Sequence, residues 1–315
     1  MDSKQTIIIP QEFDGVRLDK AMGKLADIPF FVCQVMCRKG KIKVDGKRCK
    51  PDKRVNEGQE VTLFQQEQSS VEKPAKKTVQ FSNKDLKWIE PAILYEDKNM
   101  VAINKPTGIP TQAGTGHQKS IDRLMEAYYG PKALPKLVHR LDKATTGVLV
   151  LAKGRKNAAE LTRQFRSRGM EKIYWAVVKG KLKKKEGKID LSLEKTGPEG
   201  AEKVSSLPQG KKALTYYKAL ASAGDIHLLE VHPKTGRMHQ IRAHFSAIGV
   251  PIVGDRKYGG EDVNFDNVVV PKGAIFLHAR QLSLKDDKGI KRIIAPAPKH
   301  FTDVFALFGW GEKDF

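Results

Sequence analysis

Apolar and polar positions divide the chain into two patterned regions with a polar stretch between them. Residues 65–84 read QQEQSSVEKPAKKTVQFSNK, which contains Pro74 and shows neither helical nor strand periodicity. Such a composition is typical of a linker. We therefore expect one domain at residues 1–64, a linker at 65–90 and a second domain at 91–315.

The first region has the pattern of a small mixed domain. In GVRLDKAMGKLA, from Gly15, the apolar residues share one face of a helix. FFVCQVMCRKG predicts a second helix that ends at Gly40, where a left-handed cap is favoured. KIKVDGKRC alternates around Asp45-Gly46, a hairpin signal, and GQEVTLF predicts a closing strand.

In the second region the predicted strands outnumber the predicted helices. Residues 93–95 and 100–104 suggest a hairpin, and the apolar run Val148 to Ala152 predicts a central strand. KIYWAVVKG and DIHLLEVHP predict two further strands, whereas KNAAELTRQFRSRG and RMHQIRAHFSAIG predict helices ending at Gly169 and Gly249. Strands and helices do not alternate regularly, so we expect an α+β fold rather than a doubly wound one.

The charge balance indicates a polyanionic partner. The chain has 57 Lys and Arg against 36 Asp and Glu, a net charge of +21, which favours nucleic acid over an anionic membrane. No apolar stretch approaches the roughly 18 residues of a membrane span. TIIIP, from Thr6, is too short for a signal sequence, so we expect a cytoplasmic protein.

Basic residues are concentrated in the first region. Nine basic and two acidic residues lie between Arg38 and Arg54, at the end of one predicted helix and around one turn. We expect a phosphate-binding surface there, as such clusters bind nucleic-acid backbones. Its candidate residues are Arg38, Lys39, Lys41, Lys43, Lys47 and Arg48.

No cofactor or metal motif stands out. The sequence lacks a phosphate-binding P-loop, a dinucleotide fingerprint and zinc-ligand spacing. Cys33 and Cys37 are spaced for one helix face, but with only Cys49 besides we interpret them as small core residues. We therefore expect neither a metal nor a cofactor.

Asp142 is the most informative acidic residue. In LVHRLDKATTGVLVLAK it lies among basic groups, just before the strand that we expect to be buried. A carboxylate at the mouth of a buried strand must be paired or hydrogen-bonded. On the local pattern alone, Asp142 pairs with Arg140 or caps the turn.

Two later residues are candidates on the same grounds. Arg242 borders the inward stripe of a helix that begins near Arg237, where it either binds a carboxylate or keeps its head in water. The residues of that stripe are Met238, Ile241, Phe245 and Ile248. Tyr174, in the strand KIYWAVVKG, has the pattern of a core residue with its hydroxyl at the rim.

Four segments together resemble a known family. HRLDKATTG, KIYWAVVKG and TGRMHQIRAHFSAIGVPIVGDRKYG are similar to the signature set of the RluA-type pseudouridine synthases, and NKPTGIPTQAGTG resembles the first motif of that family. The chain departs from the common DTSG form of the family at Ala144 and Thr146. Residues 13–64, with Arg17 and Asp19, resemble the S-four-like RNA-binding domain. The arrangement is most similar to the RluC-type branch, which modifies large-subunit ribosomal RNA.

The resemblance implies a fold, an activity and a site. It implies an α+β fold with a mixed, mainly antiparallel sheet, and an isomerase that converts uridine to pseudouridine in 23S rRNA, acting as a monomer without a cofactor. It makes Asp142 the catalytic aspartate, Tyr174 the residue packed on the uracil, Arg242 the partner of the aspartate, and Arg140 the residue that displaces the base.

Three more residues beside this set, His139, Arg237 and His239, are expected to contact the RNA. Two other functions stay open. One is a tRNA-directed pseudouridine synthase, and the other is a non-catalytic RNA-binding factor of ribosome assembly. A pure binder has no need for a carboxylate in the middle of its RNA-facing surface.

Overall fold

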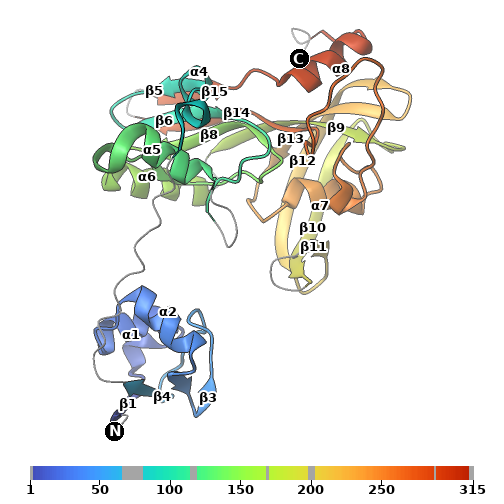
Figure 1. Cartoon of the computed structure of the whole chain (residues 1–315). Coiled ribbons are helices and arrows are strands. Elements are labelled where there is room, and N and C mark those ends of the chain that lie inside the picture. Colours follow the sequence, from blue (N-terminus) through green and yellow to red (C-terminus); the bar gives the residue numbers. More distant parts are fainter. Residues whose placement is uncertain are drawn as a thin grey trace. The chain divides into compact units, whose positions relative to one another are not determined.

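The structure, a computed structural model, describes residues 3–65, 81–113, 119–167, 170–197, 203–286 and 289–311. The chain forms two compact units, Met1–Thr78 and Val79–Phe315, and each is described here by itself. Both carry their own sheet and helices (Figure 1).

The first unit is a four-stranded antiparallel sheet with two helices. The strand order is β1-β4-β2-β3. Asp45 and Gly46 join β2 to β3 with φ values of 50° and 72°, which confirms the predicted hairpin turn. Gly40 ends the second helix with φ 70°, also as predicted. The elements are β1 Ser3–Ile8, η1 Gln11–Phe13, α1 Leu18–Leu25, α2 Phe30–Arg38, β2 Ile42–Val44, β3 Lys47–Arg48 and β4 Glu60–Gln65.

The two helices of this unit close its core over the sheet. Leu18 and Met22 of α1 are fully buried, as is Ile42 of β2. Cys33 and Cys37, one turn apart on α2, are buried in the same cluster. The thiols therefore serve as small apolar core groups, in agreement with the interpretation from their spacing.

The second unit is built on an eleven-stranded sheet within the described residues. Its main path runs β11-β10-β12-β13-β9-β14-β8-β6-β5, with β15 paired to β14 and β7 to β8. Only β8 and β14 pair in parallel in the described part of the sheet, so the predicted α+β class with a mainly antiparallel sheet is confirmed. The strands are β5 Ile93–Glu96, β6 Met100–Lys105, β7 Lys136–Leu137, β8 Thr146–Ala152, β9 Glu171–Lys179, β10 Glu186–Thr196, β11 Lys203–Ser206, β12 Lys211–Ala223, β13 Ile226–Pro233, β14 Leu277–Asp286 and β15 Gly289–Ile294.

Helices cover both faces of this sheet (Figure 1). They are α3 Asn83–Leu86, α4 Ile89–Ala92, α5 Ile121–Ala133, α6 Arg155–Arg166, α7 Gln240–Ala247, the 3-10 turn η2 Arg256–Tyr258, and α8 Lys299–Leu307. Strand β8 shows why the apolar run from Val148 is continuous. Val148 and Val150 pack in a cluster with Leu161 of α6, whereas Leu149 packs with Ile121 of α5 on the opposite face.

The polar stretch predicted as a linker is partly folded. Residues 66–80 lie outside the described residues, but Asn83–Leu86 and Ile89–Ala92 form two short helices. Ser82 and Asp85 make a capping box at the first of them, and Ile89 is fully buried. The linker prediction therefore extends too far at its carboxyl end, because one buried apolar side chain is enough to fix a segment that is otherwise polar.

Most predicted elements of the second unit are present. The hairpin β5–β6, the strands β8, β9 and β13, and the helix α6 all form where the pattern placed them. Gly169, the predicted end of α6, lies outside the described residues. The sequence patterns did not predict β10, β11, β12, β14 or α8. In the described ranges, every helix is too short or too polar to cross a lipid bilayer.

The helix predicted to begin near Arg237 is shorter than expected. His239 has φ 51° and ψ 23°, a left-handed conformation that cannot continue into a helix, so α7 begins at Gln240. Ile241 and Phe245 are buried as predicted. Met238 and Ile248 are 40% and 37% exposed and are therefore wrong members of the inward stripe.

Candidate active site

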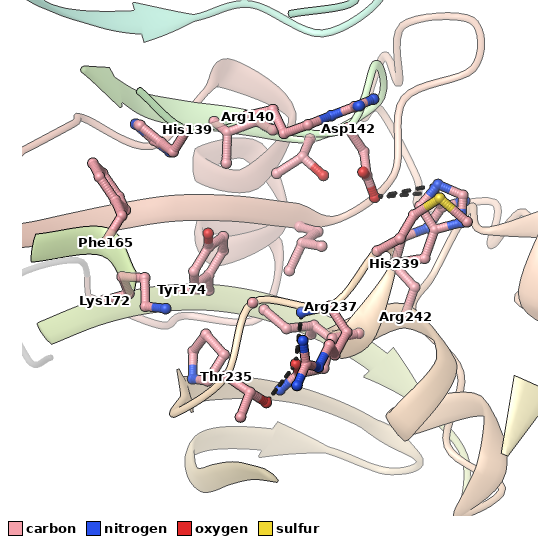
Figure 2. A pocket seen from close by; sticks show the side chains of 18 residues that line it. His139, Arg140, Asp142, Phe165, Lys172, Tyr174, Thr235, Arg237, His239 and Arg242 are labelled. Atoms are coloured by element: carbon pink, nitrogen blue, oxygen red, sulfur yellow. Dashed lines mark hydrogen bonds and ion pairs between the residues drawn. The ribbon is translucent and has the colours of Figure 1, made fainter. Parts of the chain in front are cut away.

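One pocket of the second unit collects all the candidate residues that the sequence placed there. It has a volume of about 360 Å³ and lies between the loop before β8, the strand β9 and the loop that leads into α7 (Figure 2). Its lining includes His139, Arg140, Asp142, Tyr174, Arg237, His239 and Arg242. These residues span a hundred positions of sequence, so the fold itself assembles the site.

Asp142 lies in a loop that is held by hydrogen bonds on both sides. The Thr111 hydroxyl donates to the Leu141 carbonyl at 2.6 Å and accepts from the Leu141 N–H at 3.1 Å. The N–H of Thr145 donates to the Asp142 carbonyl at 3.1 Å. With its backbone fixed in this way, the Asp142 side chain stays 23% exposed and faces the pocket.

The NKPTG segment supports this loop from below. Lys105 is fully buried, and its Nζ donates to the carbonyl oxygens of Pro106 at 2.8 Å, Ile109 at 2.9 Å and Lys143 at 3.3 Å. Burial lowers the pKa of Lys105 to about 7, and the charge of Asp142 opposes that shift. Lys105 therefore joins two loops by bonds to carbonyl groups and makes no contact with the pocket lining by its charge.

The Thr-Thr-Gly turn is required by a close strand approach. Gly147 has φ 105°, and a Cβ atom there would lie 2.2 Å from the Ala279 carbonyl oxygen of β14. Only glycine fits where these two parallel strands meet. Next to it, the Thr146 hydroxyl is 2.9 Å from Nδ1 of His278. The hydroxyl at this variant position is thus a buried structural contact between β8 and β14.

Arg242 links two carboxylates. Its Nε and Nη2 bind Asp255 at 2.6 and 2.7 Å, and its Nη1 donates to Oδ2 of Asp142 at 3.2 Å. Burial alone would lower the pKa of Arg242, but the hydrogen bonds and charge of Asp255 raise it. The guanidinium also lies over the Tyr258 ring, 4.9 Å from its centroid. Pairing with Asp142, expected from the family resemblance, is present in the structure.

His239 approaches the same carboxylate from its other side. Its Nε2 is 3.7 Å from Oδ2 of Asp142, and its Nδ1 is 2.8 Å from the Tyr258 hydroxyl. That hydroxyl accepts from the Val204 N–H at 2.9 Å, so its own proton is free to go to Nδ1. This leaves the ring proton of His239 on Nε2, facing Asp142. Burial lowers the pKa of His239, although Asp142 opposes the shift.

Tyr174 and Arg140 occupy different depths of the pocket. Tyr174 projects from β9 into its middle, and burial, with a smaller contribution from Asp142, raises the pKa of its hydroxyl (Figure 2). Arg140 is exposed at the rim, and no ion pair to Asp142 is present among the described residues. The local alternative, in which Asp142 pairs with Arg140, is therefore wrong.

His139 has a structural setting at the edge of the pocket. Its ring stacks on Phe165 with centroids 4.1 Å apart, and its Nε2 accepts from the Val150 N–H at 2.9 Å. Burial lowers the pKa of His139 to about 3, and the charge of Lys172 adds to the shift. A neutral ring is what the Val150 N–H requires, because only an unprotonated nitrogen accepts a hydrogen bond.

The basic candidates of the first unit gather on one surface. Arg38 and Lys39 end helix α2, and the remaining four flank or form the β2–β3 hairpin. Arg38, Lys39, Lys47 and Arg48 are exposed. Arg48 lies against Gly40, where an added Cβ would be 2.7 Å from its Nε. The predicted cluster is thus one continuous basic surface of this unit.

Three supporting residues were not predicted. Asp255 and Tyr258 position Arg242 and His239, and Gln240 fixes the loop before α7. The Gln240 side chain accepts from the Thr235 hydroxyl at 2.7 Å and donates to the Leu214 carbonyl at 3.1 Å. The segment GDRKYG contained both Asp255 and Tyr258, and an acidic residue directly after the apolar VPIVG was the available signal.

The pocket thus presents one carboxylate among several cations. Asp142 is its only acidic lining residue, beside Arg140, Lys172, Arg237 and Arg242. Among the described residues, no three or more His, Cys, Asp or Glu side chains come together as a metal site. The arrangement suits a ligand that carries phosphate groups and brings a neutral group to Asp142.

Two family models match this chain. The RNA pseudouridylate synthase model matches residues 99–247, and the S4 domain model matches residues 16–61. Among solved structures, the human RNA pseudouridylate synthase domain-containing protein 4 aligns with a TM-score of 0.59 and 29% identity, over 71% of this chain and 95% of that one.

Several curated relatives cover nearly the whole chain. Ribosomal large subunit pseudouridine synthase C of Rickettsia felis is 34% identical over 92% of this chain and 95% of its own. The protein of the same name from Salmonella typhi is 30% identical over 94% of each. Ribosomal large subunit pseudouridine synthase D of Borreliella burgdorferi is 34% identical over 69% of this chain and 68% of its own.

Proposed function

Because this chain belongs to the RNA pseudouridylate synthase family, and is an isomerase of uridine to pseudouridine, we propose that its substrate is 23S ribosomal RNA. Relatives that align along almost the whole chain are named large-subunit synthases, and the chain carries an S4 domain as well. We further propose that it acts in the cytoplasm, where that RNA is assembled.

One observation carries the proposed site. The carboxylate of Asp142, held by Arg242 at 3.2 Å, opens into the pocket that also contains Tyr174. A pocket of about 360 Å³ is within the range of small-ligand sites. A uridine must leave its stack to enter it, and RNA read in this way is typically a loop or bulge.

The proposed roles follow from these positions. Asp142 acts as nucleophile or base on the uridine, and Arg242 keeps it ionised and oriented. Tyr174 packs on the uracil ring. Arg140, exposed at the rim without a partner among the described residues, occupies the place that the base leaves in the stack. His139, Arg237 and His239 complete the wall around the nucleotide.

The reaction is balanced without another reactant. The bond from C1′ to N1 breaks, and its electron pair leaves with the uracil. The base turns, C5 forms a bond to C1′, the proton on C5 leaves, and N1 gains a proton. No oxidant or hydrolysis takes part. The basic surface of the first unit, Arg38 to Arg48, is proposed to bind phosphates of the same RNA and to offset the cost of extruding the base.

Pseudouridine mapping of total RNA tests this proposal. In cells that lack the gene, signals should disappear from 23S rRNA, and the wild-type gene should restore them. The variant Asp142→Asn should fail to restore them while binding the 23S transcript with nearly the wild-type Kd. Loss of signals from tRNA alone would overturn the substrate, and restoration by Asp142→Asn would overturn the site.

A further inference from the structure

Lys172 is a cation of the pocket that the roles above do not use. It projects from β9 two residues before Tyr174, on the same face of the strand, and both side chains line the pocket. Figure 2 shows the two side by side, with Phe165 and His139 beyond Lys172 and Asp142 on the far side of Tyr174. The pocket therefore has a carboxylate at one end and an amino group at the other.

The structure gives this amino group no anionic partner. Lys172 is half-buried, and no ion pair or hydrogen bond of its side chain is present among the described residues. Burial lowers its pKa, and the charge of Lys234 adds to the shift. A buried cation without a counter-charge is costly, so an anion or a carbonyl oxygen of the ligand is the group that would satisfy it.

The position of Lys172 distinguishes the base from the phosphates. Phosphate groups are strongly hydrated and remain with the RNA backbone, where the exposed Arg140 and Arg237 lie at the rim. The base is the part that enters, since it must reach the interior beside Tyr174. An ammonium next to that ring therefore meets the polar edge of the uracil.

We propose that Lys172 is a further substrate-contacting residue, whose ammonium donates a hydrogen bond to a carbonyl oxygen of the extruded uracil and stabilises the uracil anion after the glycosidic bond breaks. This inference rests on the proposed function of the same pocket. It adds a group that acts on the leaving base, whereas Asp142 is placed toward the other end.

The chemistry of uracil makes one fixed ammonium sufficient. When the bond from C1′ to N1 breaks, the electron pair on N1 is shared with O2 and O4. Rotation about the axis through N3 and C6 exchanges N1 with C5 and O2 with O4. A donor that holds O2 before the rotation therefore finds O4 in the same place afterwards. The contact stabilises the anion throughout and releases its charge when C5 bonds to C1′ and N1 is protonated.

A leaving-group experiment tests this role. The RNA spans the uridine mapped above and carries either uridine or 5-fluorouridine at that one position. Fluorine withdraws electrons, so the fluorinated base leaves more readily and needs less stabilisation. In single turnovers, Lys172→Met should consume uridine about 100-fold more slowly than the wild type. The same variant should consume 5-fluorouridine only about 10-fold more slowly, with the Kd for the RNA nearly unchanged.

Lys234→Met is the matched control. Lys234 carries the same charge close to Lys172, but it is exposed, lies over the Tyr216 ring at 5.9 Å and does not line the pocket. Its removal should leave both rates within about threefold of the wild type. Lys172→Gln repeats the test with a neutral side chain that still donates a hydrogen bond, and it should lie between Lys172→Met and the wild type.

Three results would overturn the role of Lys172: equal losses on the two RNAs, a weaker Kd with unchanged single-turnover rates, or no loss at all. The first marks a structural residue and the second a phosphate contact. Mapping uses total RNA, so a tRNA target would overturn the proposed 23S substrate and would still supply the RNA for this comparison.

Discussion

Asp255 holds Arg242 by two parallel hydrogen bonds, from Nε at 2.6 Å and from Nη2 at 2.7 Å. Asp255 is 1% exposed and Arg242 8%, so the pair is almost entirely inside the protein. This bidentate geometry fixes the plane of the guanidinium and leaves Nη1 directed at Asp142. The residue that aims the arginine at the site is thus itself remote from the pocket lining.

Replacement of Asp255 by Asn should uncouple Arg242 from Asp142. The amide keeps the size of the side chain but loses its charge and turns an N–H toward the guanidinium. Removing one partner of a buried pair costs about 3 kcal/mol, and a misdirected catalytic partner costs about 100-fold in kcat. Urea unfolding and single-turnover pseudouridine formation measure the two effects.

Asp262→Asn is the control for this substitution. Asp262 pairs with Arg256 only seven residues further along, but both side chains of that pair are largely exposed. An exposed pair contributes little, so neither stability nor kcat should change measurably. A value of kcat for Asp255→Asn within threefold of the wild type would show that Arg242 keeps its aim without Asp255.

Tyr258→Phe should disturb His239 through one lost hydroxyl. The hydroxyl accepts from the Val204 N–H at 2.9 Å and lies 2.8 Å from Nδ1 of His239. Its removal leaves a buried N–H unsatisfied, which costs about 1–3 kcal/mol. The ring proton of His239 is then free to move to Nδ1 and away from Asp142, and we expect kcat to fall about 10-fold.

The matched substitution is Tyr216→Phe. Tyr216 is 41% exposed on β12, and its hydroxyl has no hydrogen-bond partner among the described residues. Both its stability and its kcat should match those of the wild type. The kcat of Tyr258→Phe should be compared at several pH values. A loss of stability with unchanged kcat at every pH would mean that His239 has no part in orienting Asp142.

Local pattern predicted the parts of the fold that local forces determine. The apolar run at Val148 is a strand buried on both faces, and Asp45-Gly46 is a tight turn. The folded end of the predicted linker carried a signal that could have been found, since Ser82 and Asp85 have capping-box spacing before the buried Ile89. Strands β10 to β12 mix charged and apolar residues, and their burial depends on partners distant in sequence.

The site depended on information beyond local pattern. Periodicity alone favoured a pair between Asp142 and its neighbour Arg140, whereas the partner observed is Arg242, a hundred residues later. The resemblance to a family supplied that pair. Neither source indicated Asp255 or Tyr258, because their roles follow from the fold around η2, where a short turn brings them under Arg242.

Acid should unfold the protein through its buried histidines. Burial lowers the pKa to about 3 for His139 and to about 4 for His244, His278 and His300. These values lie below the ordinary 6.5, so the unfolded chain binds more protons between pH 6.5 and about 4. Stability is then complete above pH 6.5 and is lost as the pH falls through that window, by up to about 1.4 kcal/mol per pH unit for each histidine.

His278→Gln tests the sign of this dependence. His278 is fully buried between the Thr146 hydroxyl and the Ala295 carbonyl, so the variant should be less stable than the wild type at pH 7. Its urea unfolding free energy should nevertheless fall less steeply between pH 6.5 and 5, because one proton-binding group is absent. Parallel curves for the two proteins across this range would contradict a neutral buried His278.

Gly147→Ala should prevent the catalytic unit from folding. A Cβ at Gly147 would lie 2.2 Å from the Ala279 carbonyl oxygen, and neither β8 nor β14 can move away without breaking its other pairings. Its φ of 105° also disfavours any side chain. We expect a loss of more than about 4 kcal/mol, seen as insoluble expression or as a missing thermal transition.

Gly224→Ala separates the close approach from the backbone conformation. Gly224 also has a positive φ, 57°, in the turn between β12 and β13, but no atom lies within 4 Å of its added Cβ. Its substitution should cost only the conformational preference, about 1–2 kcal/mol, and leave a soluble, active enzyme. If the two variants unfold at similar temperatures, the contact between β8 and β14 does not explain the glycine that follows Thr146.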